Sequence, residues 1–286
     1  MRRFFHFSLV FSLLLSVAAL AGCGVTGKGT VKTLDPALVA SARDSWDDFL
    51  KVSRNADALS GPFRLSANLH YAGDEGTQRV SAYFWGNGAQ ENPHPLRLDI
   101  QGGMGTVMAA VREDASSFMA YIPSDNAVYL SPSGTGSLEA FGVPVPFSLA
   151  DLALLFNGRY EHFFLGAESG TESGEHSAPA AFQNEDGVVC FALAEENGAR
   201  FAGTLVLGAG GLPLSWTEQG ENGWTLLIDY PADSTRTTPR RVRFKHAGGK
   251  QATVVVRDLA RTEPFRGQQL ELTFPQGTEI RILQPR

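Results

Sequence analysis

From Phe63 onwards the sequence alternates apolar and polar residues with a period of two, and this pattern constrains the fold more than any other feature. Apolar residues occupy every second position from Phe63 to Tyr71 and again from Val80 to Phe84, which is the period of a half-buried β-strand. Tyr83 and Trp85 make the second face partly apolar as well. A sheet with two apolar faces must be covered by helices or must line a cavity. The pattern therefore predicts a mainly β protein.

Turn-forming residues divide the rest of the chain into similar short segments. Turns at 195–198, 208–211 and 218–223 separate apolar runs, as expected for antiparallel strands. Together the segments predict about 11 to 13 strands. No internal repeat and no shift in composition marks a boundary after Leu34, so residues 35–286 are predicted to form a single domain.

Two segments have the apolar spacing of helices. Asp35 and Pro36 supply a cap and a first-turn proline, and the apolar residues from Leu38 to Leu50 then fall on one face. The second segment, Val143 to Gly158, begins with two Val-Pro pairs, has serine and aspartate at capping-box spacing, and is apolar nearly all round. A helix of that kind is buried, or it covers something apolar.

The N-terminal segment resembles a bacterial lipoprotein leader. Two arginines precede an apolar run that ends in Leu-Ala-Gly-Cys at Cys23, so residues 1–22 are predicted to be a signal peptide. The resemblance implies that Cys23 carries acyl chains and that 23–34 form a tether. The alternative is an uncleaved membrane anchor, although the run is short for one. Gly24, rather than aspartate, favours the outer membrane.

A glycine-rich hairpin is predicted between Leu96 and Val111. Alternation up to Gln101 is interrupted by three glycines, and Gly103 and Gly105 flank Met104. Glycine supplies the positive φ angles of tight turns, so Met104 is expected at the tip. Two alternatives remain open: Met104 folds back under the sheet, or it meets something apolar outside the protein. For the second, we expect Gly103, Met104 and Gly105 to form a loop that inserts into the outer-membrane interface.

Charge and motif content exclude several classes of function. The formal net charge is −6, and loss of a leader with Arg2 and Arg3 would make it −8; this argues against nucleic acid or anionic lipid bound through charge. Cys190, within an apolar strand, is expected to be a small buried hydrophobe rather than a nucleophile. The histidines lack metal-ligand spacing, and no nucleotide or hydrolase motif is present. We expect neither an enzyme nor a cofactor.

The segment LRLDIQGGMG, followed by FGVPVPFSLADLALLFNG, resembles the LolB family of outer-membrane lipoprotein receptors. The segments at 239–242 and 252–256 and FPQGTEI at 274–280 are similar to the closing strands of the LolA and LolB fold. The chain departs from the family in its length, in having methionine at the projecting position, and in an insertion at 168–180. The resemblance implies a half-closed antiparallel β-barrel covered by helices, a periplasmic LolA-like carrier as partner, and a periplasm-facing location on the outer membrane.

Three functions are consistent with this sequence: a receptor that inserts lipoproteins into the outer membrane, a lipid- or glycolipid-binding lipoprotein, and a structural surface lipoprotein with a filled core. The first two require a hydrophobic cavity for acyl chains. Its predicted lining is aromatic and aliphatic: Phe84, Trp85, Leu98, Phe118, Leu152 and Phe156.

Overall fold

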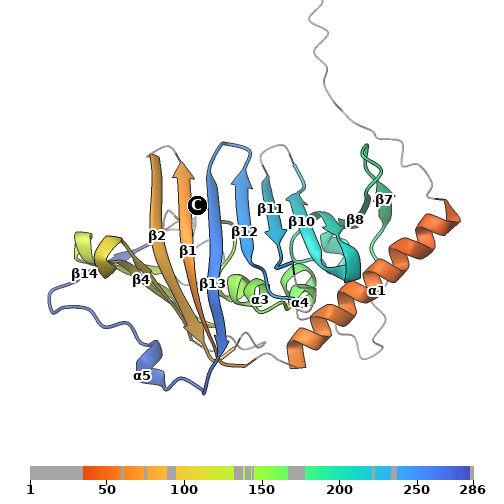
Figure 1. The fold of residues 1–286 in the computed structure, drawn as a ribbon. Helices are drawn as coiled ribbons and strands as arrows, with labels where there is room; N and C mark the ends of the chain where they lie inside the picture. The colour runs from red at the N-terminus through yellow and green to blue at the C-terminus, as the bar shows by residue number, and fades with distance from the viewer. Residues whose placement is uncertain are drawn as a thin grey trace, which may run out of the picture. The chain divides into compact units, whose positions relative to one another are not determined.

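The protein is mainly β, with one open sheet and a few helices (Figure 1). The computed structural model describes residues 35–58, 61–73, 76–88, 95–131, 138, 143, 145–166, 178–220, 223–232 and 237–283. All described elements belong to one compact unit that begins at Lys32. The predicted fold class, an open antiparallel sheet with helices on it, is confirmed.

The described residues form a 14-stranded sheet in the order β14-β6-β5-β4-β3-β2-β1-β13-β12-β11-β10-β9-β8-β7. This is one strand more than the upper end of the 11 to 13 expected; the two edge strands, β14 and β7, are short. The strands are β1 (Phe63–Gly73), β2 (Gly76–Gly86), β3 (Leu96–Gln101), β4 (Val107–Glu113), β5 (Phe118–Ile122), β6 (Ala127–Ser131), β7 (Ala181–Gln183), β8 (Val189–Leu193), β9 (Gly203–Leu207), β10 (Pro213–Glu218), β11 (Trp224–Asp229), β12 (Arg241–His246), β13 (Gln251–Arg261) and β14 (Glu279–Ile282).

Neighbouring strands pair antiparallel throughout, except that β14 runs parallel to β6. The centre of the sheet is the long pairing of β1 with β13, in register from Phe63 opposite Arg261 to Ala72 opposite Gln251. This pairing is broken once, by an irregularity beside Ser66. It joins β2 to β6 and β14 on one side to β7 to β12 on the other, so the two halves of the sheet meet along β1 and β13 (Figure 1).

Helices cover one face of the sheet, which we call the inner face. They are α1 (Pro36–Ala58), α3 (Leu149–Phe156) and α4 (Tyr160–Leu165). Asp35 caps α1 by accepting a hydrogen bond from the Ala37 N–H at 2.9 Å, and the apolar face of α1 is buried as predicted, with Trp46 and Phe49 almost inaccessible.

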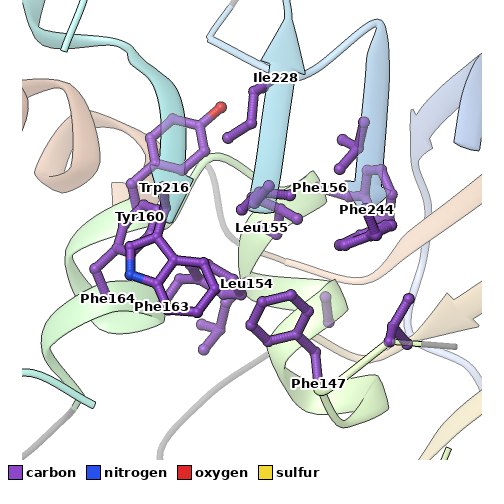
Figure 2. Close-up of a cluster of buried hydrophobic side chains, with 14 of the residues drawn as sticks. Phe147, Leu154, Leu155, Phe156, Tyr160, Phe163, Phe164, Trp216, Ile228 and Phe244 are labelled. Atoms are coloured by element: carbon purple, nitrogen blue, oxygen red, sulfur yellow. The ribbon is translucent and has the colours of Figure 1, made fainter. Parts of the chain in front are cut away.

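The second predicted helix is present: the described residues before Leu149 are not helical, Ser148 caps α3, and α3 ends before Gly158. The chain then continues into α4, which the sequence did not reveal. Phe147, just before α3, is the centre of an aromatic cluster with ring centroids 5.1 Å from Phe163, 5.7 Å from Phe244 and 6.0 Å from Trp216 (Figure 2). This cluster fixes α3 and α4 against the inner face.

The segment 262–278, which we call the C-terminal strap, packs on the opposite, outer face of β2 to β5 and leads into β14 at the edge of the sheet. It contains the short helix α5 (Gly267–Leu270), and its Leu270 and Leu272 side chains are buried. The Phe274 ring lies 6.1 Å from that of Tyr121 on β5. One part of the outer face is therefore covered by the chain itself. Among the described helices, none is long and apolar enough to span a membrane.

Candidate functional site: an apolar pocket and an exposed turn

An entirely apolar pocket lies between the inner face of the sheet and α3. Its floor consists of inward side chains of β1, β2, β3, β12 and β13, and its cover includes Leu149, Leu152 and Phe156 of α3. No polar atom contributes to its exposed lining. Such a surface favours an apolar ligand, because each buried methylene contributes about 0.8 kcal/mol.

The pocket has a volume of about 60 Å³. Small-molecule sites are usually about 300–1,000 Å³, so a whole acyl chain does not fit beside the α3 side chains in this conformation. Several lining residues, Leu69, Leu98, Leu152 and Val254 among them, are only partly buried. Entry of an acyl chain therefore requires α3 to move away from the sheet.

Local polar contacts hold the start of α3 in place. Ser148 and Asp151 form the predicted capping box, with the Ser148 hydroxyl accepting from the Asp151 N–H at 3.1 Å. The Glu113 carboxylate, at the end of β4, accepts hydrogen bonds from the N–H groups of Leu149 (2.9 Å) and Ala150 (3.4 Å). Through these two hydrogen bonds Glu113 ties the start of α3 to the sheet.

Glu113 is almost inaccessible to water. Burial raises the pKa of its carboxyl to about 7, against the opposing effect of the two backbone hydrogen bonds. Asp151, equally buried, lies 2.9 Å from a guanidinium nitrogen of Arg200. The start of α3 therefore rests on a buried polar group whose charge changes near neutral pH.

Four of the six predicted cavity residues line the pocket: Phe84, Leu98, Leu152 and Phe156. The prediction for Trp85 is wrong. Strand alternation places Trp85 on the outer face, where its Nε1–H donates to the Gln269 carbonyl of the C-terminal strap at 3.2 Å and the Arg97 guanidinium lies 5.5 Å from its ring. On the second apolar face of β2, the strap therefore contacts Trp85, whereas Tyr83 is exposed.

The prediction for Phe118 is also wrong. Phe118 is on the inner face of β5, opposite Glu113 in register, and is completely buried in the general core rather than at the pocket. On this side of β1, β3 is the farthest strand that contributes a residue to the pocket. Phe118 is on β5, two strands farther out.

The glycine turn connects β3 and β4 as a short 3₁₀ segment, Gly103–Gly105. The Gly102 N–H donates to the Thr106 carbonyl at 2.9 Å, and Met104 has the left-handed angles φ 59 and ψ 21. The Met104 side chain is fully exposed. It does not fold under the sheet, which leaves an external apolar contact as the remaining alternative.

Two further apolar side chains beside this turn were missed from the sequence. Val107 and Met108, at the start of β4, are also exposed, because an irregularity in the β3–β4 register precedes Ala109. Met104, Val107 and Met108 thus form an exposed apolar group, here called the methionine tip. The signal available in the sequence was the pair Val107-Met108, which follows Gly105 after a single threonine.

Several sequence predictions concern residues outside the described ranges. These are Cys23, the leader 1–22, the tether 23–34 and nearly all of the insertion at 168–180. Cys190 is buried, as expected, and burial raises the pKa of its thiol. Within the described part of the chain, no group of three or more His, Cys, Asp or Glu side chains could hold a metal ion.

No protein-family model and no curated protein sequence matches the chain. Among solved structures, the chain is similar to a DUF1329 family protein from Desulfovibrio piger, with a TM-score of 0.53 and 11% identity over 80% of this chain and 97% of the other. It is also similar to a LolA superfamily protein from Nitrosomonas europaea, with a TM-score of 0.46 and 10% identity over 81% of this chain and 97% of the other. At these identities the likeness concerns the fold alone.

Proposed function

We propose that this protein is an outer-membrane lipoprotein that accepts lipoproteins from a LolA-like periplasmic carrier and inserts them into the outer membrane. Acyl chains of the cargo lie against the inner face after α3 has moved, and Cys23 anchors the protein. The observation that carries the proposal is the entirely apolar pocket, covered by α3 together with Leu138, Val143 and Val145, which precede it. The resemblance of the hairpin and helix segments to the LolB family supports the receptor role.

The position of the methionine tip also supports delivery to a membrane. A fully exposed methionine has no folding role at the tip of a turn. Burial of one such side chain contributes about 1.5–3 kcal/mol, which biases orientation at a bilayer when a lipid anchor supplies proximity. Partial burial of cargo beneath a movable helix keeps its release possible.

Acyl-chain binding can be tested with the chain beginning at Gly24, which retains every described element. A fluorescent fatty acid should bind saturably at one site and be displaced by palmitate. Leu152→Asn places an amide in the pocket lining and should weaken binding at least ten-fold. Leu214→Asn is the matched control, because Leu214 is exposed and outside the pocket. Thermal unfolding of both variants checks that they fold.

Absence of saturable binding in the folded wild-type chain would contradict the proposal. The small volume of the pocket favours, as the alternative, a structural lipoprotein with a filled core, and this result would support it. Binding without transfer of a lipoprotein into liposomes would instead indicate a lipid- or glycolipid-binding lipoprotein.

A further inference from the structure

The outer face of the central strands is positively charged, although the chain as a whole has a formal net charge of −6. Alternation in β1, β2, β11, β12 and β13 places on this face Asp229 and Asp258 together with a larger set of cations: Arg64, Arg79, Arg241, Arg243, Lys245 and Arg257. Asp229 pairs with Arg241 and Arg243. The negative net charge argued against a partner bound through charge. On this part of the outer face that argument does not hold, because the fold brings together cations from strands that are distant in sequence.

Two of these arginines, Arg79 and Arg257, line a single polar pocket of about 330 Å³ that opens on the outer face. They come from β2 and β13, on either side of β1, which contributes Asn68 and His70. Arg257 reaches the pocket because it is the extra residue at the β1–β13 irregularity, between Val256 and Asp258. Its wall also includes Ser81, Gln101, Gly102 and Gly103.

The polar side chains of this pocket have free hydrogen-bonding capacity. Arg79 and Arg257 are exposed and form no ion pair with any described residue, and the side chains of Asn68, Ser81 and Gln101 make no hydrogen bond within the described ranges. Guanidinium groups present several donors in a fixed plane that matches phosphate oxygens. With amide and hydroxyl donors beside them, the arrangement suits a phosphate group better than a single carboxylate.

The pocket is continuous with the methionine tip. Gly102 and Gly103 form part of its wall, and Met104 is the next residue. Apolar side chains beside arginines form the arrangement that proteins present to a membrane interface, with the apolar groups among acyl chains and the cations at the level of the lipid phosphates. The source of the phosphate is therefore a lipid rather than a dissolved ion.

We propose that the pocket bounded by Arg79 and Arg257 binds the phosphate of an anionic lipid headgroup and thereby orients the methionine tip in the bilayer. The inference rests on the membrane contact of the proposed function, but it does not require acyl-chain cargo. It assigns the outer face a ligand distinct from that of the inner pocket.

The test uses the chain from Gly24 to Arg286 and two kinds of vesicle, phosphatidylcholine alone and phosphatidylcholine mixed with phosphatidylglycerol. The wild type should bind the mixed vesicles more tightly. Arg79→Gln and Arg257→Gln should each weaken that binding about five-fold, since one arginine near an anionic surface contributes about that much. Arg64→Gln is the matched control: Arg64 is also exposed on the outer face of β1, but it lies outside the pocket.

The outcomes separate this proposal from its alternatives. An equal loss in all three variants would show a diffuse surface charge and would overturn the pocket. Saturable binding of inorganic phosphate that also displaces the chain from mixed vesicles would overturn the lipid as its source. The arginine variants should bind fatty acid as the wild type does. Loss of fatty-acid binding would therefore test the inner pocket, and loss of vesicle binding would test the outer one, independently of each other.

Discussion

The sheet contains two copies of one glycine turn, and they differ in what they touch. In Gly102–Thr106 and Gly208–Leu212 the first N–H donates to the fifth carbonyl, at 2.9 and 2.8 Å, and the fourth N–H donates to the first carbonyl, at 3.3 and 3.2 Å. The third residue is left-handed in both, Met104 at φ 59 and Gly210 at φ 67. The second turn packs against α1, whereas the first projects its methionine into solvent.

The two turns also differ in the conformational cost of their left-handed residue. A left-handed residue other than glycine costs roughly 1–2 kcal/mol, and Gly210 avoids that cost in a turn whose role is packing. Met104 bears it in a turn that makes no packing contact through its tip. The exposed turn is therefore less stable than the same backbone allows, which is expected when a side chain serves binding rather than folding.

Gly211→Ala should have the largest effect, because a Cβ at this position would lie 2.2 Å from the Phe49 backbone nitrogen of α1. We expect a loss of about 3 kcal/mol or more in the free energy of unfolding. Gly105→Ala is the matched control: Gly105 is the fourth residue of the other turn, with φ 76 against 75, and has no close neighbour. Denaturant unfolding of both variants measures the difference. An equal loss would mean that packing against α1 does not distinguish the turns.

The strand that leaves the exposed turn, β4, ends at Glu113, which holds the start of α3. Glu113→Gln tests how much this carboxyl contributes to the free energy of unfolding and to its pH dependence. Because burial raises the pKa of Glu113 to about 7 from 4.5, its stabilising contribution is complete below about pH 4.5 and is lost as the pH rises to about 7. The loss is about 3 kcal/mol. The glutamine variant, which keeps an acceptor for the Leu149 N–H, should show a flatter dependence of unfolding free energy on pH across this window.

Unfolding curves between pH 4.5 and 8 provide the measurement. Glu196→Gln, at an exposed position, is the control and should follow the wild type. A Glu113→Gln variant with the wild-type pH dependence would show that Glu113 does not carry this titration.

Met104→Glu should leave folding unchanged and weaken vesicle binding, because the exposed turn has no packing role to lose. Removing a buried methionine corresponds to about 1.5–3 kcal/mol, or roughly ten-fold or more in affinity for both kinds of vesicle. Val39→Glu, another exposed apolar position, on α1, is the control and should bind as the wild type does. A Met104→Glu chain that no longer folds would contradict the contrast drawn between the two turns.

Exchanging the third residues should have the smallest effect. Met104→Gly should raise the free energy of unfolding by about 1 kcal/mol, and Gly210→Met should lower it by a similar amount; a Cβ at Gly210 meets nothing within 4 Å. Thermal unfolding of the two variants measures both. If the two changes have the same sign, backbone conformation does not account for the difference between the turns.

Local patterns predicted the elements that depend on nearby residues. The cap at Asp35, the Ser148 capping box and the alternation in β1 and β2 act over a few positions, and all appear in the structure. The glycines around Met104 predicted its position at a turn in the same way. Half-burial of the strands follows from these patterns, whereas the open form of the sheet was expected from the resemblance to the LolA and LolB fold.

Features that depend on distant pairing were not predictable. An apolar residue at position 85 is accommodated on the outer face because the C-terminal strap crosses it there. The contact is with Gln269, 184 residues later in the sequence. Arg79 and Arg257 meet only because β1 pairs with both β2 and β13. Similarly, α4 is short and its aromatic residues resemble those of a strand, so its conformation is decided by the Phe147 cluster rather than by propensity.

The pairing of β1 with β13, described above as the centre of the sheet, also sets the order in which the protein can be completed. Synthesis delivers β1, which ends at Gly73, well before its partner β13, which begins only at Gln251. Until then one edge of β1 is open, and β6 stays open until β14 arrives. An open edge can pair with another chain. The unfinished chain is therefore most vulnerable to aggregation before residue 251 has been synthesised, and chaperones that shield strand edges would matter most in that interval.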